Sequence, residues 1–239
     1  MTTTTDSTVV RGHERARGSR HVEPRVIVRY PPDQRANHWI TVIAFFLLAT
    51  SGLAFFHPAF FPLVVFLGGP QWARILHPWV GVAMFVSFMI LAFRLWRDNI
   101  WGQGDTQWMK QIGDVVMNHD DRLPAIGKYN PGQKLLFWVL LGAMTLLLLT
   151  GIVIWRSIFG VYFSVPIHRV AVLLHSISAF VLIASIFVHI YAAIWVKGSI
   201  RAMTRGTVSH AWAHHHHPLW FRRMIGRDEV HPADRDRPV

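Results

Sequence analysis

The stretch IHRVAVLLHSISAFVLIASIFVHIYAAIWV, which runs from Ile167 to Val196, decides the fold. It is almost entirely apolar, and its one charged side chain, Arg169, stands near its start. At a rise of about 1.5 Å per residue, roughly 20 residues cross the hydrocarbon core of a bilayer, so this stretch predicts a membrane-spanning helix. Two histidines, His175 and His189, interrupt its interior. An ionisable side chain is costly at membrane depth, so both indicate a functional site.

Three more apolar stretches of spanning length precede it, at His38 to Phe56, His77 to Trp96 and Leu135 to Trp155. No acidic residue occurs between Gln34 and Arg97, or between Arg122 and Arg227. Of the 239 residues, 52% are hydrophobic and only 15% are charged, whereas soluble domains carry roughly 25% charged residues. We therefore predict an all-α fold, an integral membrane four-helix bundle with four transmembrane helices.

The polar segments around these stretches predict three regions. Residues 1–36 form a polar, Arg-rich tail, residues 37–197 form the membrane bundle with a cytoplasmic interfacial loop at 98–133, and residues 198–239 form a C-terminal tail. Lys and Arg number seven before span one, six between spans two and three and eight after span four, against one and two in the other connections. The positive-inside rule then predicts a multi-pass protein of the bacterial inner (plasma) membrane with both termini cytoplasmic. The net charge of +11 lies in these ends, which favours a membrane rather than nucleic acid as the partner.

Three segments outside the spans carry separate expectations. The stretch His57 to Gln71 is apolar but broken by Pro and Gly, which favours an interfacial or re-entrant loop over a fifth span. Apolar residues from Trp108 to Val116 fall at helical spacing, which is typical of an amphipathic interfacial helix or of a packed connector. The run from His214 to His217 is expected on the cytoplasmic surface, where it binds metal only adventitiously.

The chain contains 15 histidines, an unusually high number that points to a functional role, and it contains no cysteine. The lack of Cys excludes disulfides, thiolate metal sites and iron–sulfur ligation within this chain. His38 begins span one at the cytoplasmic side and His77 begins span two at the outer side. His175 and His189, 14 residues apart, lie within roughly 40° of the same helix face and about 21 Å apart along the axis. Since span four runs inward, His175 is level with His77, and His189 is level with His38.

Two levels with two imidazoles each predict two stacked b-type haems with bis-histidine ligation of the iron. A neutral imidazole binds iron through one ring nitrogen and donates its other N–H to a nearby acceptor. Zinc is the competing metal, but no Cys, Asp or Glu accompanies these histidines at membrane depth. The alternative without metal is a hydrogen-bonded packing role. His57 and His168 are rivals for the outer level, although we expect both to face water or lipid headgroups.

Four glycines stand close in sequence or depth to these histidines: Gly52, Gly81, Gly142 and Gly151. A residue without a side chain gives a flat porphyrin room near the backbone. Small residues serve helix packing more commonly in membranes, and the sequence leaves both uses open.

Several motifs carry a resemblance to a known family. They are R-x-x-H-W at Arg35 to Trp39, H-P-W-V-G at His77 to Gly81, Y-N-P-G-Q-K at Tyr129 to Lys134, and W-A-H-H-H-H-P-L-W at Trp212 to Trp220. With these motifs, and with the spacing of the four histidines, the chain resembles the di-haem cytochrome b (gamma) subunit of membrane-bound respiratory formate dehydrogenase. The resemblance covers roughly residues 30 to 223.

The resemblance implies partners, cofactors and a direction of electron flow. Two haem b groups are implied, an outer one held by His77 and His175 and an inner one held by His38 and His189. Electrons come from a periplasmic iron–sulfur beta subunit, which a molybdenum- or tungsten-containing alpha subunit supplies by oxidising formate. This chain then passes them to quinone on the cytoplasmic side and does not itself oxidise formate, so no catalytic residue for that reaction is expected in it.

The resemblance also implies a quinone site, for menaquinone or ubiquinone, at Asn130, Gly132 and His189. An Asn side chain and a Gly backbone beside a haem ligand can hydrogen-bond a quinone carbonyl directly or through water. The sequence departs from the family at Pro131, where another residue is common and where proline offers no N–H.

Other functions fit a bundle of this kind. One is the cytochrome b subunit of a hydrogenase or of another quinone-linked oxidoreductase, and another is a stand-alone quinone cytochrome b. A third is a haem-free membrane anchor or transporter in which the histidines hydrogen-bond between helices. The Y-N-P-G-Q-K loop and the His-rich segment after span four favour formate dehydrogenase.

Overall fold

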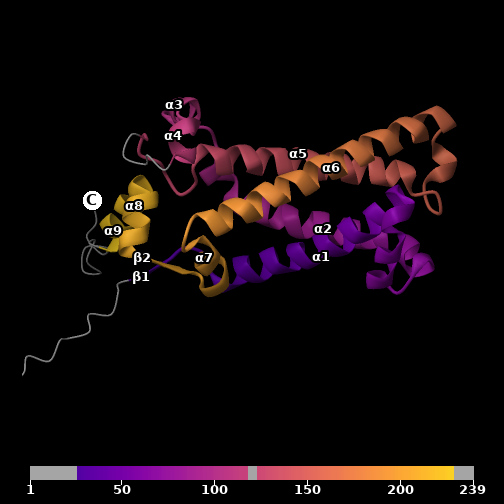
Figure 1. The fold of residues 1–239 in the computed structure, drawn as a ribbon, viewed down its shortest axis with the longest axis horizontal. Coiled ribbons are helices and arrows are strands. Elements are labelled where there is room, and N and C mark those ends of the chain that lie inside the picture. Colours follow the sequence, from indigo (N-terminus) through magenta and orange to yellow (C-terminus); the bar gives the residue numbers. More distant parts are fainter. Residues whose placement is uncertain (1–25, 118–122, 229–239) are drawn as a thin grey trace, which may run out of the picture.

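Four long antiparallel helices form the body of the protein in the computed structural model, which describes residues 26–117 and 123–228 (Figure 1). They are α1 (Pro32–Phe56), α2 (Pro70–Leu95), α5 (Pro131–Ile154) and α6 (Val165–Trp195). Each is long and apolar enough to cross a membrane. The prediction of a four-span helical membrane bundle is confirmed.

Proline marks the start of all four long helices. Pro32, Pro70 and Pro131 occupy the first helical position, and Pro166 lies in the first turn of α6. The first residues of a helix have no intrahelical acceptor for their N–H groups, so proline fits there without losing a hydrogen bond. The helices therefore begin two to seven residues before the apolar stretches seen in the sequence.

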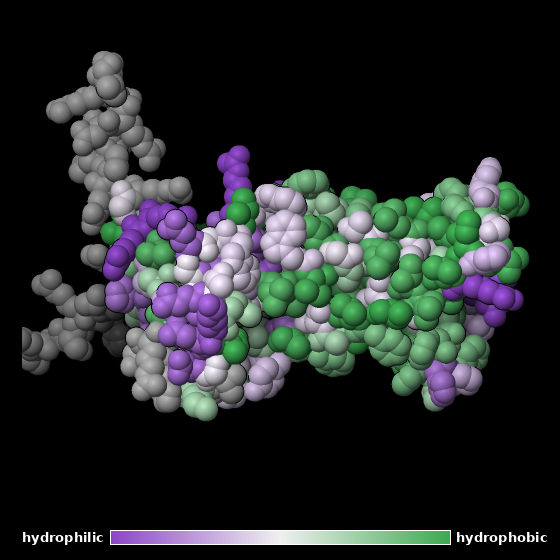
Figure 2. Space-filling view, turned by 90° about the horizontal axis from the view of Figure 1, so that it is seen from above, coloured by the Kyte–Doolittle hydropathy of each residue, from purple (hydrophilic) through white to green (hydrophobic). Residues whose placement is uncertain are grey.

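The bundle consists of two helical hairpins. Helix α1 packs mainly on α2, and α5 mainly on α6, while α2 and α5 join the hairpins. One core cluster at the centre takes side chains from all four helices: Phe45, Met84, Ala143, Met144 and Leu182. Only 17% of the residues in the most apolar window of each helix are buried within the protein. Figure 2 shows the resulting apolar belt, a surface that suits lipid and not water.

Short helices connect the spans. At the end of the bundle where α1 ends, which we name the outer end after the predicted orientation, η1 (Pro58–Leu67) buries Val64 and Leu67 against α1 and α2. It is too short to be a fifth span. The link between α5 and α6 contains η4 (Gly160–Tyr162). At the other end lie η2 (Trp96–Asn99), α3 (Asp105–Lys110) and α4 (Ile112–Val116). The amphipathic segment is thus two short helices, and Trp108 is buried in the protein, as the packed-connector alternative requires.

A small folded unit covers the end of the bundle at which α1 begins (Figure 1). Strands β1 (Val26–Val28) and β2 (Thr207–Ser209) pair antiparallel, next to α7 (Ser199–Arg205), α8 (His210–His216) and α9 (Pro218–Asp228). Its core consists of Ile27, Ala202, Val208, Ala213 and Trp220. Within the expected N-terminal tail, Val26–Val28 therefore form β1 and residues 32–36 begin α1. The described residues contain one two-stranded sheet beside the helices.

Candidate functional site

Four histidines form two pairs inside the bundle, one near each end. His38 on α1 faces His189 on α6, with ring centroids 6.4 Å apart and ring planes at 52°. His77 on α2 faces His175 on α6, with centroids 6.5 Å apart and planes at 56°. The structure thus brings together the same pairs that the spacing along span four predicts.

In the pair of His77 and His175, which we name the outer pair after the predicted orientation, hydroxyl groups fix the orientation of both imidazoles. Ser51 Oγ lies 2.7 Å from His77 Nδ1 and also donates to the carbonyl oxygen of Leu47, at 2.8 Å. A hydroxyl has a single proton, so towards His77 the Ser51 oxygen is the acceptor and Nδ1 carries the hydrogen. The Nε2 lone pair of His77 is then free to bind a metal.

His175 is held by the same device. Thr150 Oγ1 donates to the carbonyl oxygen of Leu146, at 2.6 Å, and lies 2.9 Å from His175 Nδ1. It therefore accepts a hydrogen bond from Nδ1–H, which leaves the His175 Nε2 lone pair available. Ser51 and Thr150 are both buried, so water does not compete for these contacts.

A glycine follows each of these two hydroxyl residues and makes room for the ring. A Cβ placed on Gly52 would lie 3.6 Å from His77 Cε1, and one on Gly151 would lie 3.5 Å from His175 Cε1. Each outer imidazole therefore rests on a hydroxyl–glycine dipeptide of the neighbouring helix. For these two glycines, the observed role is space for a histidine ring.

In the pair of His38 and His189, which we name the inner pair, His38 is held differently. His38 Nδ1 is buried and has no hydrogen-bond partner among the described residues. Beside it, Asn37 on α1 is bonded to Ser87 on α2: Ser87 Oγ donates to Asn37 Oδ1 at 2.6 Å, and Asn37 Nδ2 donates to the Ser87 carbonyl oxygen at 3.0 Å. These bonds join α1 to α2 at the level of His38 without restraining its ring.

The separation of the rings fits one metal ion between each pair. Bonds of about 2 Å from a metal to two imidazole nitrogens place the ring centroids roughly 6 Å apart, close to the two observed separations. In residues 26–117 and 123–228, no group of three or more His, Cys, Asp or Glu is placed to hold a metal ion. Zinc takes four ligands and is poorly served by two imidazoles. Haem iron needs only two axial ligands from the protein, so the residues present fit haem.

A model of the family described as prokaryotic cytochrome b561 matches residues 29–206. The chain belongs to this family. Membership implies b-type haem, the group that the paired imidazoles fit.

Several cytochrome b556 subunits are similar to this cytochrome over most of its length. It is 50% identical to the formate dehydrogenase cytochrome b556(fdo) subunit of Escherichia coli K12 over 198 residues, 83% of this chain and 93% of that protein. It is 47% identical to the formate dehydrogenase cytochrome b556 subunit of Haemophilus influenzae, over 83% of this chain and 84% of that protein. Identity to the nitrate-inducible formate dehydrogenase cytochrome b556(Fdn) subunit of E. coli K12 is 42%, over 84% and 92% of the two chains.

The expected quinone residues lie at the same end of the cytochrome as the inner histidine pair. Asn130 caps α5, with its Oδ1 accepting from Gln133 N at 2.8 Å while Gln133 Oε1 accepts from Asn130 N at 3.0 Å. Pro131 stands at the first helical position, where no N–H is needed, so this departure from the family costs no hydrogen bond. A Cβ on Gly132 would lie 3.4 Å from Asn130 Oδ1, within the cap. His189 lies near the C-terminal end of α6, at this same end of the bundle.

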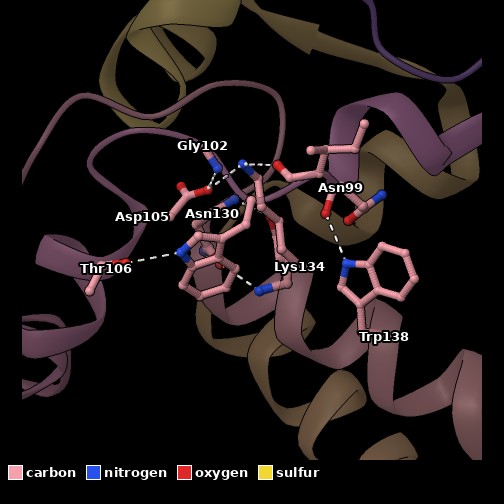
Figure 3. Close-up of polar contacts among 10 residues, drawn as sticks. Asn99, Gly102, Asp105, Thr106, Asn130, Lys134 and Trp138 are labelled. Carbon is pink, nitrogen blue, oxygen red and sulfur yellow. Dashed lines mark hydrogen bonds and ion pairs between the residues drawn. The ribbon is translucent and has the colours of Figure 1, made fainter.

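Buried polar contacts hold this capped loop against the segment that follows α2 (Figure 3). Lys134 Nζ lies 2.7 Å from Asp105 Oδ2 and donates to the Ile100 carbonyl oxygen at 3.0 Å. The same Asp105 oxygen accepts from Gly102 N at 2.6 Å. Trp138 Nε1 donates to the Asn99 carbonyl oxygen at 3.0 Å. One ion pair thus fixes the first turn of α5, and with it the position of Asn130.

The structure corrects one expectation about the histidine run. His214 and His215 are exposed, but His217 is buried and is no surface residue. Its Nδ1 donates to the Gly127 carbonyl oxygen at 2.9 Å, so Nε2 is the acceptor that faces Arg29 Nη2 at 3.2 Å. Burial, with a smaller contribution from the Arg29 charge, lowers the pKa of His217 to about 3.

The two rival histidines lie outside the pairs. His57 Nδ1 accepts from Ala59 N at 3.1 Å and caps η1 at the outer end. His168 Nδ1 lies 3.2 Å from the carbonyl oxygen of Ser164, in the first turn of α6. Sequence reasoning missed Ser51 and Thr150, although the recurrence of a hydroxyl residue before glycine in spans one and three was a usable signal.

Proposed function

We propose that this cytochrome is the haem-bearing membrane subunit of a respiratory formate dehydrogenase and that it carries electrons across the membrane to quinone. The observation that carries the proposal is the presence of two imidazole pairs, each at the separation of two axial ligands, near opposite ends of one bundle. The similarity to three formate dehydrogenase cytochrome b556 subunits supports this choice of complex.

In this proposal the four histidines are the axial ligands of two haem b groups. His77 and His175 would hold the outer group through Nε2, and His38 and His189 would hold the inner one. Haem supplies one-electron transfer without proton transfer when it is bound. Ser51 and Thr150 keep the outer imidazoles in the tautomer that leaves Nε2 free.

Quinone binds at the inner end, at Asn130, Gly132 and His189. The capping contact uses Asn130 Oδ1, so its Nδ2 hydrogens remain available to a quinone carbonyl oxygen. Gly132 has no side chain beside Asn130 and so leaves room there. Electrons cross from the outer to the cytoplasmic face, and the reduced quinone takes its protons from the cytoplasm. Turnover therefore builds up a membrane potential without a proton channel. Moving one charge against a potential of 100 mV costs about 2.3 kcal/mol.

The orientation and the partners follow from the same proposal. The end that bears β1, β2 and α7 to α9 is cytoplasmic, because most Lys and Arg residues lie there while Arg74, Arg156 and Arg169 lie at the other end. The outer end then faces the periplasm of a bacterium and meets an iron–sulfur beta subunit. A molybdenum- or tungsten-containing alpha subunit oxidises formate, and the membrane is the bacterial inner membrane.

The test uses the purified complex and two variants, His38→Ala and His189→Ala. We expect reduced-minus-oxidised spectra with formate to retain the outer haem and lose the inner one, and quinone reduction to cease. The control is His168→Ala, on the same helix as His189 but outside both pairs, and it should keep both haems. Intact spectra for both haems in His38→Ala or His189→Ala would contradict the assignment, and a colourless wild-type preparation would favour a haem-free anchor.

A further inference from the structure

A cavity of about 270 Å³ opens at the end of the bundle at which α1 begins, which we call the polar end, and none of its lining residues belongs to either histidine pair. It lies between β1, η2, the loop before α5, and α9. Its charged lining residues are three cations and one acid: Arg29, Lys128, Arg223 and Asp98. The cavity therefore carries an excess of positive charge next to the predicted cytoplasmic surface of the membrane.

Arg29 is buried, with 5% of its surface exposed, and its hydrogen bonds are incomplete. Nη2 donates to the Lys128 carbonyl oxygen at 2.7 Å and faces His217 Nε2 at 3.2 Å. Nη1 is buried and has no hydrogen-bond partner among the described residues. A buried cation with unmade hydrogen bonds is costly and calls for an acceptor.

The neighbouring groups do not satisfy this need. Asp98, the only acid in the lining, pairs with Lys128 at 3.3 Å. Aromatic rings surround the Arg29 guanidinium, with Trp220 centred 5.0 Å and Trp212 5.1 Å from Cζ. Such rings attract a cation and orient it, but they accept no conventional hydrogen bond from Nη1.

Arg223 adds a second cation on the open side of the cavity, and it has no acidic partner among the residues that the structure describes. A Cβ on Gly127 would lie 3.3 Å from Arg223 Nη2, so the guanidinium rests close to the backbone of the loop that also bears Lys128. Arg223 is exposed, whereas Arg29 lies at depth. The cavity thus offers one guanidinium at its base and another at its mouth.

We propose that this cavity binds a phosphate group. Guanidinium forks match phosphate oxygens, and charge-assisted hydrogen bonds from two arginines are the stronger kind. The cavity is lined by residues just after α2 and just before α5, so it lies at the polar end of the bundle. Figure 2 shows that this end adjoins the apolar belt, which is where lipid headgroups are expected. An anionic phospholipid headgroup and free phosphate share this chemistry, and the test separates the two sources.

The test has two arms on the full chain purified in its complex. In the first, inorganic phosphate is titrated at constant ionic strength while the melting temperature is followed. In the second, native mass spectrometry counts lipid retained from nanodiscs of phosphatidylglycerol or of phosphatidylcholine. We expect saturable stabilisation by phosphate, selective retention of phosphatidylglycerol, or both, and the responding arm identifies the source.

The variant Arg223→Gln should weaken this binding by roughly tenfold, since it removes one charge-assisted contact. Its matched control is Arg222→Gln, which removes a neighbouring exposed charge that does not line the cavity and should bind as the wild type does. Arg29→Lys, which keeps the charge and loses the fork, should weaken binding at least as much. If that variant fails to fold, the Arg223 and Arg222 pair still decides. Absence of saturable binding in both arms, or equal weakening by Arg222→Gln and Arg223→Gln, would overturn the proposal.

Discussion

Replacing Ser51 with Ala removes a single hydroxyl group from beside His77. In the wild type, Ser51 Oγ accepts from His77 Nδ1 at 2.7 Å, and Ser51 is 0% exposed, so no water is at hand to take its place. The Leu47 carbonyl loses a side-chain donor but keeps its place in the helix. The main consequence is a buried N–H without an acceptor on a proposed haem ligand.

The size of the effect follows from that unsatisfied donor. Leaving a buried donor unpaired costs about 1–3 kcal/mol, and removal of a hydrogen-bond partner of a metal ligand costs roughly 10–100-fold in affinity. We therefore expect Ser51→Ala to release the outer haem 10–100-fold more readily, while the inner haem is retained. Thr150→Val should act in the same way through His175, since its contact is 2.9 Å long.

The assay is haem transfer from the purified complex to an excess of a haem-scavenging protein, followed by absorbance. Thr50→Ala is the matched control, because Thr50 makes the same kind of bond to a backbone carbonyl, that of Phe46 at 2.8 Å, in the turn that contains Ser51. Equal haem loss from Thr50→Ala and Ser51→Ala, or unchanged retention in Ser51→Ala, would refute the reasoning.

Three further predictions concern the polar end. Gly206→Ala should lower the melting temperature, because residue 206 has φ +84° and a Cβ there would lie 2.7 Å from the Tyr30 carbonyl oxygen; the left-handed conformation alone costs about 1–2 kcal/mol, and an unchanged melting curve would contradict this. Lys134→Met should destabilise the protein by about 3–5 kcal/mol, since it leaves Asp105 buried and unpaired; adding Asp105→Asn should restore part of the loss in a double-mutant cycle. The lowered pKa of His217 (about 3, against 6.5) predicts stability that is complete above pH 6.5 and is lost progressively as the pH falls towards 3; limited proteolysis against pH measures this, and the same pH profile in His217→Gln would exclude His217 as the cause.

The spans and the histidine pairs were predictable because the bilayer imposes simple rules. Apolar length and the separation of Lys and Arg from the spans follow from the cost of polar groups in lipid. The spacing of His175 and His189 follows from helix geometry. Hydropathy missed the helical residues that extend beyond the apolar stretches, as at Pro32 and Pro70, although the prolines themselves signal a helix start.

The contacts at the polar end were not predictable from sequence in the same way. Strand Val26–Val28 pairs with Thr207–Ser209, which lies almost at the other end of the chain. Each strand has only three residues, too few to show the alternation of apolar and polar side chains that would predict a strand. Arg29 and His217 meet although 188 positions separate them. Such pairs depend on how the spans bring both ends of the chain to one face, so no local pattern in the sequence indicates that His217 is buried.

The two proposed haem sites differ in how their imidazoles are held, and this difference favours electron transfer from the outer site to the inner one. Both outer histidines donate Nδ1–H to a hydroxyl, which would strengthen electron donation from Nε2 to a bound haem iron and favour its oxidised state. His38 has no such acceptor among the described residues, so its imidazole lends less of this support to oxidised iron at the inner site. If the outer haem is more reducing than the inner one, inward electron transfer is downhill. This driving force offsets the cost of moving an electron against the membrane potential, which is about 2.3 kcal/mol per charge and 100 mV. The hydroxyl–glycine dipeptides at Ser51 and Thr150 therefore support the proposed direction of transfer as well as the position of the ligands.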